Sequence, residues 1–243
     1  KEMGVPLSKK IRFIVGANEE TDWKCMDYYF NKKKIPAPQM SFTPDAVFPL
    51  IYAEKGVFQY QLVTDVSEDI TLSGGNAFNA VADHASVLLP LELETVIRKS
   101  LLSWETQTRC HFTVENAGAS LRLTAEGFAA HAAHPSTGIN AISGLMSALS
   151  ELSPENELAR IATFYMERIG FDLTGKGLGI DLTDEISGRL SFNPSTTVYR
   201  LLTSAHRFRS SFRNSLSVPD SVLRTHMQLN PSTYLRILSW FRL

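Results

Sequence analysis

The sequence has little cysteine and no long apolar run, and these two absences exclude whole classes of protein. Its 243 residues include only two cysteines, Cys25 and Cys110, which form no CxxC pair. A disulfide-stapled extracellular domain is therefore excluded, and reduced thiols in a cytoplasmic protein are expected. No apolar stretch is long enough to span a bilayer, and no secretion signal is indicated after Lys1-Glu2-Met3.

Net charge is nearly absent as well. The 24 Lys and Arg residues almost balance the 25 Asp and Glu residues, so the formal charge is −1. This balance gives no reason to expect a nucleic acid or a membrane as a partner. The charges are unevenly distributed, because residues 190–243 contain seven arginines, no lysine and a single acid, Asp220. The character of the chain is therefore expected to change near residue 190.

An acidic pair follows the first apolar run of the chain. The run Ile11–Val15 predicts a short strand, and the apolar spacing over Thr21–Lys34 predicts a helix. Glu19 and Glu20 lie between these two elements, where the strands of an α/β sheet present functional groups. Considered alone, such a pair is more often a solvated helix start, because acidic side chains favour the helix dipole.

A third acid, Asp45, lies in a stiff, extended stretch between Pro44 and Pro49. Three carboxylates on loops are typical ligands of a divalent cation that activates a water molecule. Without its surrounding sequence, Asp45 would be interpreted as an aspartate that caps a turn.

The rest of the chain predicts a β-α-β-β-α unit. Apolar spacing indicates strands over 56–63 and 81–89, a helix over 91–104, a hairpin of strands 110–114 and 120–125, and helices over 139–152 and 156–169. This order is typical of an open-faced α+β sandwich. Ser73-Gly74-Gly75-Asn76 is interpreted as a domain boundary or hinge.

Three stretches also carry a family resemblance. They are Gly16–Thr21, Phe42–Gly56 and Gly127–Ala141, and they occur in the order that the family shows. They resemble the Xaa-His dipeptidase branch, with dipeptidase V and carnosinase-like enzymes, of the aminoacylase–carnosinase superfamily of two-zinc metallopeptidases. The resemblance extends over about residues 11–193.

The resemblance implies an α/β protein with three parts. Residues 1–72 would form part of a zinc-peptidase catalytic domain, and residues 73–193 would form its α+β lid domain. Residues 194–243 match nothing in the family. Because the charge also changes there, we interpret this tail as non-native sequence, of the kind that a shifted reading frame produces.

The resemblance further implies the roles of three acids. Glu19 would be the general base, which takes a proton from the attacking water and returns it to the leaving amine. Glu20 and Asp45 would each ligate one zinc ion. The expected cofactor is therefore zinc, with two ions in the family arrangement and other divalent metals left open.

Two further residues are expected to contact the substrate. His131 matches the family's lid histidine, which binds the oxyanion of the tetrahedral intermediate, and Asn79 is a second candidate for polarising the substrate. From the residues alone, the alternative for His131 is an ordinary loop histidine, and Asn79 is equally a strand-capping asparagine. His131 and His134 have HxxH spacing, but the chain has no HExxH helix, so a zinc site from this pair alone is not expected.

The expected function is hydrolysis of a dipeptide bond by a metal-activated water. The alternatives are an N-acyl-amino-acid amidohydrolase with the same metal chemistry and a non-catalytic binding or dimerisation module. The family's His-x-Asp motif, bridging aspartate and carboxyl-terminal histidine ligand have no match in the sequence. The chain is therefore expected to be a fragment that is inactive by itself, and its oligomeric state is left open.

Overall fold

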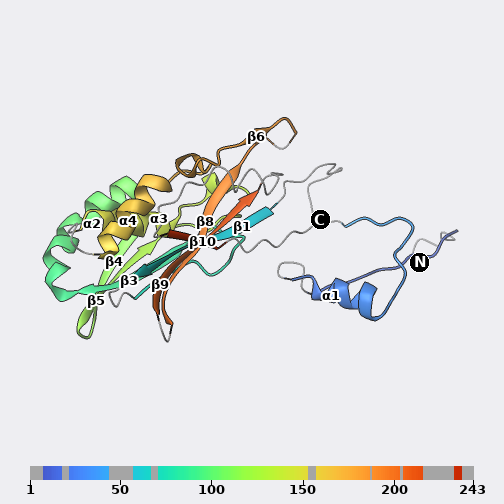
Figure 1. Ribbon diagram of the computed structural model, residues 1–243, viewed down its shortest axis with the longest axis horizontal. Helices are drawn as coiled ribbons and strands as arrows, with labels where there is room; N and C mark the ends of the chain where they lie inside the picture. The colour runs from blue at the N-terminus through green and yellow to red at the C-terminus, as the bar shows by residue number, and fades with distance from the viewer. Residues whose placement is uncertain are drawn as a thin grey trace, which may run out of the picture. The chain divides into compact units, whose positions relative to one another are not determined.

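The structure is a computed structural model, and it describes residues 8–17, 22–43, 57–66, 71–152, 157–186, 188–202, 205–215 and 233–236 (Figure 1). The chain divides into two compact units, Lys1–Tyr52 and Ala53–Leu243. In the first unit, helix α1 (Lys24–Asp27) continues into a π-helical segment, η1 (Tyr28–Lys32). The helix predicted over Thr21–Lys34 is thus confirmed in its central part.

The second unit contains a large antiparallel sheet with the strand order β10-β1-β9-β8-β2-β3-β5-β4. The strands are β1 (Val57–Val66), β2 (Leu72–Gly74), β3 (His84–Pro90), β4 (His111–Ala117), β5 (Ser120–Glu126), β8 (Ser191–Leu202), β9 (Ala205–Ser215) and β10 (Thr233–Arg236). Two short strands, β6 (Thr183–Asp184) and β7 (Gly188–Arg189), form a separate ribbon. With its helices, this unit has a mixed α/β fold, as the sequence predicts.

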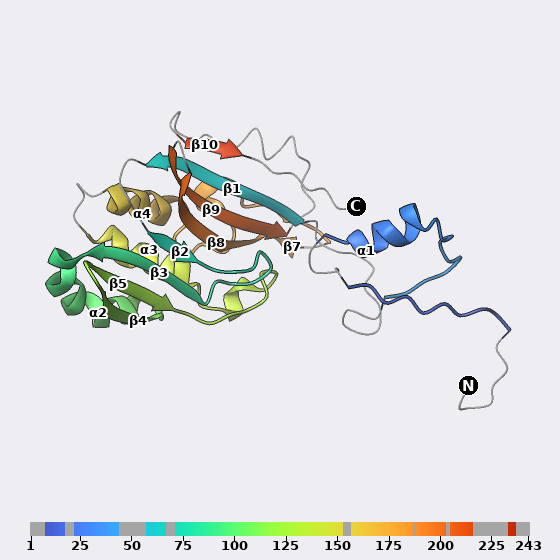
Figure 2. The same ribbon diagram turned by 90° about the horizontal axis from the view of Figure 1, so that it is seen from below.

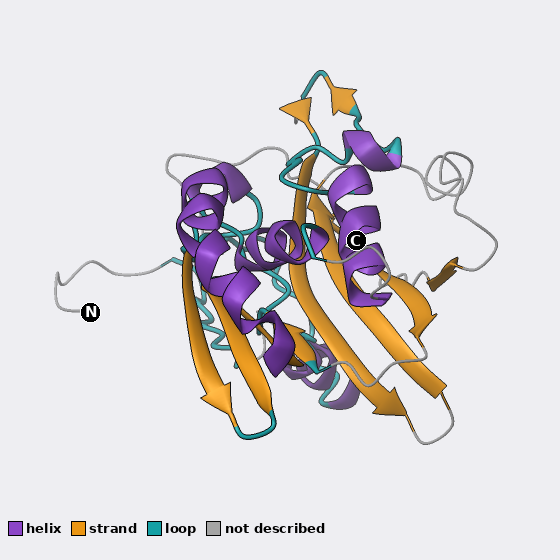
Figure 3. Ribbon diagram, turned by 90° about the vertical axis from the view of Figure 1, so that its left-hand side faces the viewer, coloured by secondary structure: helices purple, strands orange, loops and turns teal. Residues whose placement is uncertain are grey.

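Three helices cover one face of this sheet (Figure 3). They are α2 (Glu94–Thr108), α3 (Ala141–Ser150) and α4 (Glu157–Arg168), and short 3-10 turns lie at Leu91–Leu93, Pro135–Thr137 and Lys176–Leu178. Helix α3 contacts strands β3, β5 and β8 as well as both of the other helices. None of the helices in the described part of the chain is long and apolar enough to cross a membrane.

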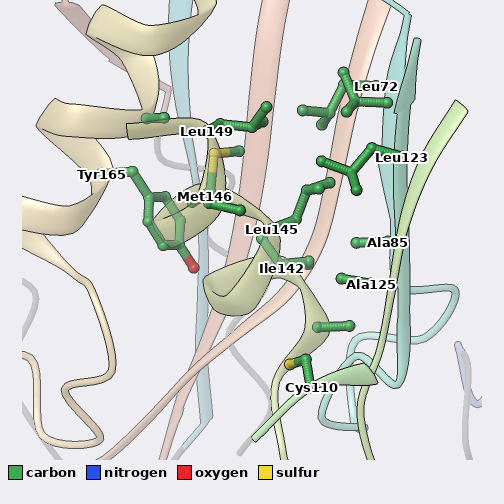
Figure 4. Packing of buried hydrophobic residues seen from close by; sticks show 14 of the residues in the cluster. Leu72, Ala85, Cys110, Leu123, Ala125, Ile142, Leu145, Met146, Leu149 and Tyr165 are labelled. Atoms are coloured by element: carbon green, nitrogen blue, oxygen red, sulfur yellow. The ribbon is translucent and has the colours of Figure 1, made fainter. Parts of the chain in front are cut away.

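The hydrophobic core lies between α3 and the sheet (Figure 4). Ile142, Leu145 and Leu149 of α3 are fully buried, and they pack in one cluster with Leu72 of β2 and Leu123 of β5. Because α4 covers α3 on its other side, the helix is buried nearly all round. This enclosure explains why its sequence is apolar or small at almost every position.

The predicted β-α-β-β-α unit is confirmed as β3-α2-β4-β5-α3. The predicted hairpin is β4–β5, and Gly118 at its turn has a φ of +74° that favours glycine. The strand predicted over 56–63 is β1, which pairs with β9 and β10 at the other side of the sheet (Figure 2). The sheet is therefore wider than the predicted sandwich.

The strand predicted over Ile11–Val15 is wrong. Residues 11–16 have an irregular backbone, and Ile11, Phe13 and Val15 are 72%, 90% and 80% exposed. An apolar run becomes a stable strand only when neighbouring strands pair with it. None of the described strands pairs with this segment.

The stretch that is interpreted as a hinge is partly a strand, because Ser73 and Gly74 belong to β2 in the sheet. Gly75 leaves this strand with a φ of +65°, and a Cβ atom there would overlap the carbonyl oxygen of Ser195 in β8. Only glycine fits this position. The domain limits predicted after residues 72 and 193 stay predictions, and β8 continues through Asn193.

Candidate functional site

The three predicted metal-site acids lie outside the described residues. Glu19, Glu20 and Asp45 fall in the gaps at 18–21 and 44–56, so their roles stay predictions. Carboxylate oxygens are among the usual ligands of zinc, so the donor type suits that metal. Within the residues that the structure describes, no group of three or more His, Cys, Asp or Glu side chains could hold a metal ion.

The two residues that are predicted to contact the substrate, Asn79 and His131, lie on paired segments of the second unit. Ala80 and His131 form an isolated antiparallel bridge. On one side of this bridge, the N–H of Ala132 donates to the carbonyl of Asn79 at 2.9 Å. On its other side, the N–H of Val81 donates to the carbonyl of Ala130 at 2.8 Å. Two residues that are far apart in the sequence are therefore neighbours in space.

The loop that carries His131 has a defined shape. Two backbone hydrogen bonds of 2.9 Å between Phe128 and Ile139 close its base. Gly127 permits this closure, because a Cβ atom there would overlap the carbonyl oxygen of Ile139. Within the loop, the buried Pro135 begins a 3-10 turn. Glycine and proline thus fix the backbone that presents His131.

The ring of His131 accepts a hydrogen bond from the backbone. The N–H of Ala133 donates to Nδ1 at 3.2 Å. A backbone N–H can only donate, so Nδ1 is the unprotonated nitrogen and the neutral ring carries its proton on Nε2. The side chain is exposed, so this N–H can donate to a bound molecule. Such a donor can polarise a carbonyl or stabilise a developing negative charge.

His134 shapes the same loop through its backbone. Its N–H donates to the carbonyl of His131 at 2.8 Å. Its own carbonyl accepts from the N–H of Thr137 at 3.1 Å and from the hydroxyl of Thr137 at 2.8 Å. These bonds need no imidazole, so the HxxH spacing here reflects the turn of the loop rather than a paired metal site.

Sequence reasoning missed the polar side chains of β8 that support this site. Asn193 donates to the carbonyl of Ala80 at 2.9 Å, and Ser195 donates to the carbonyl of Phe78 at 2.9 Å. The hydroxyl of Ser191 also reaches the His131 loop. The signal in the sequence is the alternation of polar residues, but that pattern is typical of a strand face in contact with water. Their burial could therefore not be predicted.

Cys110 is a core residue and not a nucleophile. Its Sγ lies 3.8 Å from the carbonyl oxygen of Asn140. Burial raises the pKa of the Cys110 thiol, so the thiol stays protonated at neutral pH. A buried, protonated thiol is chemically inert. Chemistry based on this cysteine is therefore excluded.

Comparison with known proteins identifies relatives of this chain. The Bacillus subtilis (strain 168) protein named Putative dipeptidase YtjP is 32% identical over 210 residues, which cover 82% of this chain and 44% of that protein. Putative dipeptidase SAUSA300_1697 and Putative dipeptidase SAOUHSC_01868, both of Staphylococcus aureus, are 31% identical with the same coverage. The chain is similar to proteins named as dipeptidases. No family model matches the sequence.

The names of these relatives agree with a family of peptidases. This agrees with the resemblance described for the sequence at the level of a peptidase, and the Xaa-His dipeptidase branch stays a prediction. The chain spans less than half the length of the relatives that it matches, because the aligned region covers 44% of each of them.

Proposed function

We propose that this chain is part of a zinc-dependent dipeptidase of the Xaa-His dipeptidase branch. The observation that carries the proposal is that the segment of Asn79 pairs with the loop of His131, whose Nδ1 accepts from a backbone N–H so that Nε2 carries the donor. The similarity to dipeptidases from two organisms supports the same reaction. A content of only two cysteines, Cys25 and Cys110, suits a reducing compartment such as the cytoplasm.

His131 has the chemistry of a donor for a developing oxyanion. When water adds to the carbonyl of a dipeptide, negative charge builds up on the carbonyl oxygen. A neutral imidazole with its proton on Nε2 can donate to this oxygen without giving up the proton. Asn79, whose carbonyl accepts from Ala132 next to this histidine, is the second candidate for polarising the substrate.

The three acids supply the remaining chemistry in this proposal. Glu20 and Asp45 would hold the zinc ions, together with ligands from outside this chain. Zinc supplies a water of lowered pKa when it is bound. Glu19 takes the proton of the attacking water and later transfers it to the leaving amine, which needs a carboxylate that is not itself bound to metal.

Substrate assays on two proteins test the proposal. A full-length protein that contains this chain should hydrolyse dipeptides, including those with a carboxyl-terminal histidine, and should lose activity when a chelator removes zinc. The isolated chain should show no turnover under the same conditions. Cleavage of N-acyl-amino acids without cleavage of dipeptides would instead favour an amidohydrolase. Robust turnover by the isolated chain would contradict the proposed need for ligands from elsewhere.

A further inference from the structure

Three alternating residues of β8 place buried donors against the site. Ser191, Asn193 and Ser195 are 9%, 1% and 0% exposed. Each donates a hydrogen bond to a backbone carbonyl, over 3.2, 2.9 and 2.9 Å respectively. In the same order, the acceptors are the carbonyls of Ala133, Ala80 and Phe78. These three donors are called the β8 polar ladder below.

The acceptors belong to the two segments that carry Asn79 and His131. The carbonyls of Phe78 and Ala80 accept from β8, whereas the carbonyl of Asn79 between them accepts from Ala132. Residues 78–80 are therefore held from both sides, by the ladder and by the His131 loop.

The ladder is connected to His131 by two routes. Asn193 holds Ala80, the residue that is bridged to His131. Ser191 holds the carbonyl of Ala133, whose N–H donates to Nδ1 of His131. One route fixes the backbone of the histidine, and the other fixes the donor that selects its protonated ring nitrogen.

Asn140 fixes the orientation of the central member of the ladder. Its side-chain oxygen caps helix α3. Its Nδ2 donates to the carbonyl of Pro194 at 2.7 Å and to Oδ1 of Asn193 at 3.3 Å. The Nδ2 of Asn193 is then directed to Ala80 and to the hydroxyl of Ser195. A buried polar network in which each amide is paired on both sides is rigid.

Satisfaction of buried carbonyls is the simplest reason for such donors, since buried polar groups are normally paired. The apolar side chain of Phe192, which lies between Ser191 and Asn193 in β8, belongs to the hydrophobic core. Because successive side chains of a strand point to opposite faces, Ser191 and Asn193 lie on the face of β8 away from this cluster. All three positions serve the segments that carry Asn79 and His131.

We propose that Ser191, Asn193 and Ser195 are positioning residues, which hold the His131 loop and keep the ring proton of His131 on Nε2. They act through Ala80, Ala133 and Phe78. Their importance for catalysis rests on the proposed function, in which His131 donates to the substrate. A donor that is oriented before the substrate binds needs no reorganisation during the reaction.

The test is the long-range proton–nitrogen correlation spectrum of the His131 ring in the whole chain, with the signal assigned by its loss in His131→Ala. This spectrum distinguishes a protonated ring nitrogen from an unprotonated one. The wild-type chain should show a single pattern, with Nε2 protonated. Asn193→Asp, which keeps the size but removes the amide donor, and Ser191→Ala should both give a mixture of the two tautomers.

Two variants serve as controls. Ser191→Thr keeps the hydroxyl and should keep the wild-type pattern. Ser143→Ala removes another buried serine, whose hydroxyl lies 3.1 Å from the hydroxyl of Tyr165 between α3 and α4. It should lower stability and leave the His131 ring unchanged, which separates a local effect on the ring from a general loss of structure.

The proposal is overturned if folded Asn193→Asp and Ser191→Ala chains keep the wild-type His131 pattern. If Asn193→Asp does not fold, Ser191→Ala decides alone, because its side chain is at the edge of the buried region. In a full-length protein, the ladder variants should lower kcat roughly 10- to 100-fold with little change in KM. If the ring pattern changes and turnover does not, the proposed role of His131 fails while the ladder stands.

Discussion

His131 and His134 show how two histidines three residues apart can differ in role. Both side chains are exposed on the same loop. Only for His131 does a backbone donor, the N–H of Ala133, select which ring nitrogen is protonated. His134 contributes its backbone to the turn through bonds to His131 and Thr137. A substitution of each side chain should therefore have different consequences.

We expect His131→Ala in a full-length protein to lower kcat strongly while zinc content and fold stay intact. The loss should correspond to about 2–4 kcal/mol of transition-state stabilisation, the scale of one oxyanion donor. Steady-state kinetics and the affinity for a phosphinate analogue of the intermediate should fall in parallel, since both report transition-state binding. His134→Ala is the matched control and should change much less. Damage by His134→Ala with a silent His131→Ala would show that the loop is misassigned.

Substitutions of the adjacent glutamates Glu19 and Glu20 should also differ in their effects. Glu19→Gln should leave the zinc content near normal, because the amide removes a base but no ligand. Turnover should fall roughly 10²- to 10⁴-fold, as for the loss of a positioned acid–base group. Glu20→Gln should lower zinc occupancy as well, measured by metal analysis after dialysis. Equal metal loss in both variants would mean that the two roles are reversed or shared.

The sequence identifies the candidate substrate-contacting residues of this site, but it does not identify the side chains that hold them in place. Asn79 and His131 are identified by a family resemblance, and the structure shows that they are neighbours. The donors Ser191, Asn193 and Ser195 are not identified, because an alternating polar strand is typical of a solvated face. Their burial depends on which loop covers β8, and that contact joins residues more than 50 positions apart.

At the scale of elements, the sequence pattern predicts those helices and hairpins whose formation depends on interactions between residues close in the sequence. The helices at α2, α3 and α4 follow from apolar spacing, and the β4–β5 hairpin follows from alternation around a glycine turn. Their ends are set by particular residues, such as Asn140, which caps α3, and Arg109, whose φ of +64° ends α2. The predicted strand at Ile11–Val15 fails because a strand also needs a partner, which no local pattern supplies.

Helix α3 packs so closely on the start of β4 that the addition of a single methyl group should lower the stability of the chain. A Cβ atom at Gly144 would overlap the Sγ of Cys110 (Figure 4 shows Cys110 beside α3). Gly144→Ala would gain about 1 kcal/mol of helix propensity. Overpacking of a rigid core costs about 1–3 kcal/mol. We therefore expect a net loss of stability in urea denaturation of the whole chain.

Removal of the sulfur should relieve this clash. The double variant Gly144→Ala with Cys110→Ala should be more stable than the sum of the two single effects predicts, because the two side chains are in direct contact. A coupling free energy near zero would mean that α3 shifts away from β4 instead. The coupling free energy between the two substitutions thus measures how rigidly α3 is held between the sheet and α4.

At the scale of the whole molecule, the sheet and the sequence lead to different interpretations of residues 194–243. The family resemblance ends at Asn193, and the charge changes at about the same place. In the structure, β8 continues beyond this residue and pairs with β2 through Thr197 and Val198. Ser195 and the carbonyl of Pro194 also take part in the hydrogen bonds around residues 78–80 and Asn140. A non-native tail would have to supply these contacts by chance.

Truncation decides between these two descriptions of residues 194–243. A chain that ends at Ser215 keeps β8 and β9 and should unfold at nearly the same urea concentration as the whole chain. A chain that ends at Asn193 leaves β2 without a partner on one side and the carbonyl of Phe78 without its donor. Each buried carbonyl without a donor costs about 1–3 kcal/mol, so this shorter chain should be clearly less stable. Equal stability of both truncated chains would show that the tail adds nothing, and translation of the coding DNA in its other frames would then be expected to resume the family sequence after Asn193.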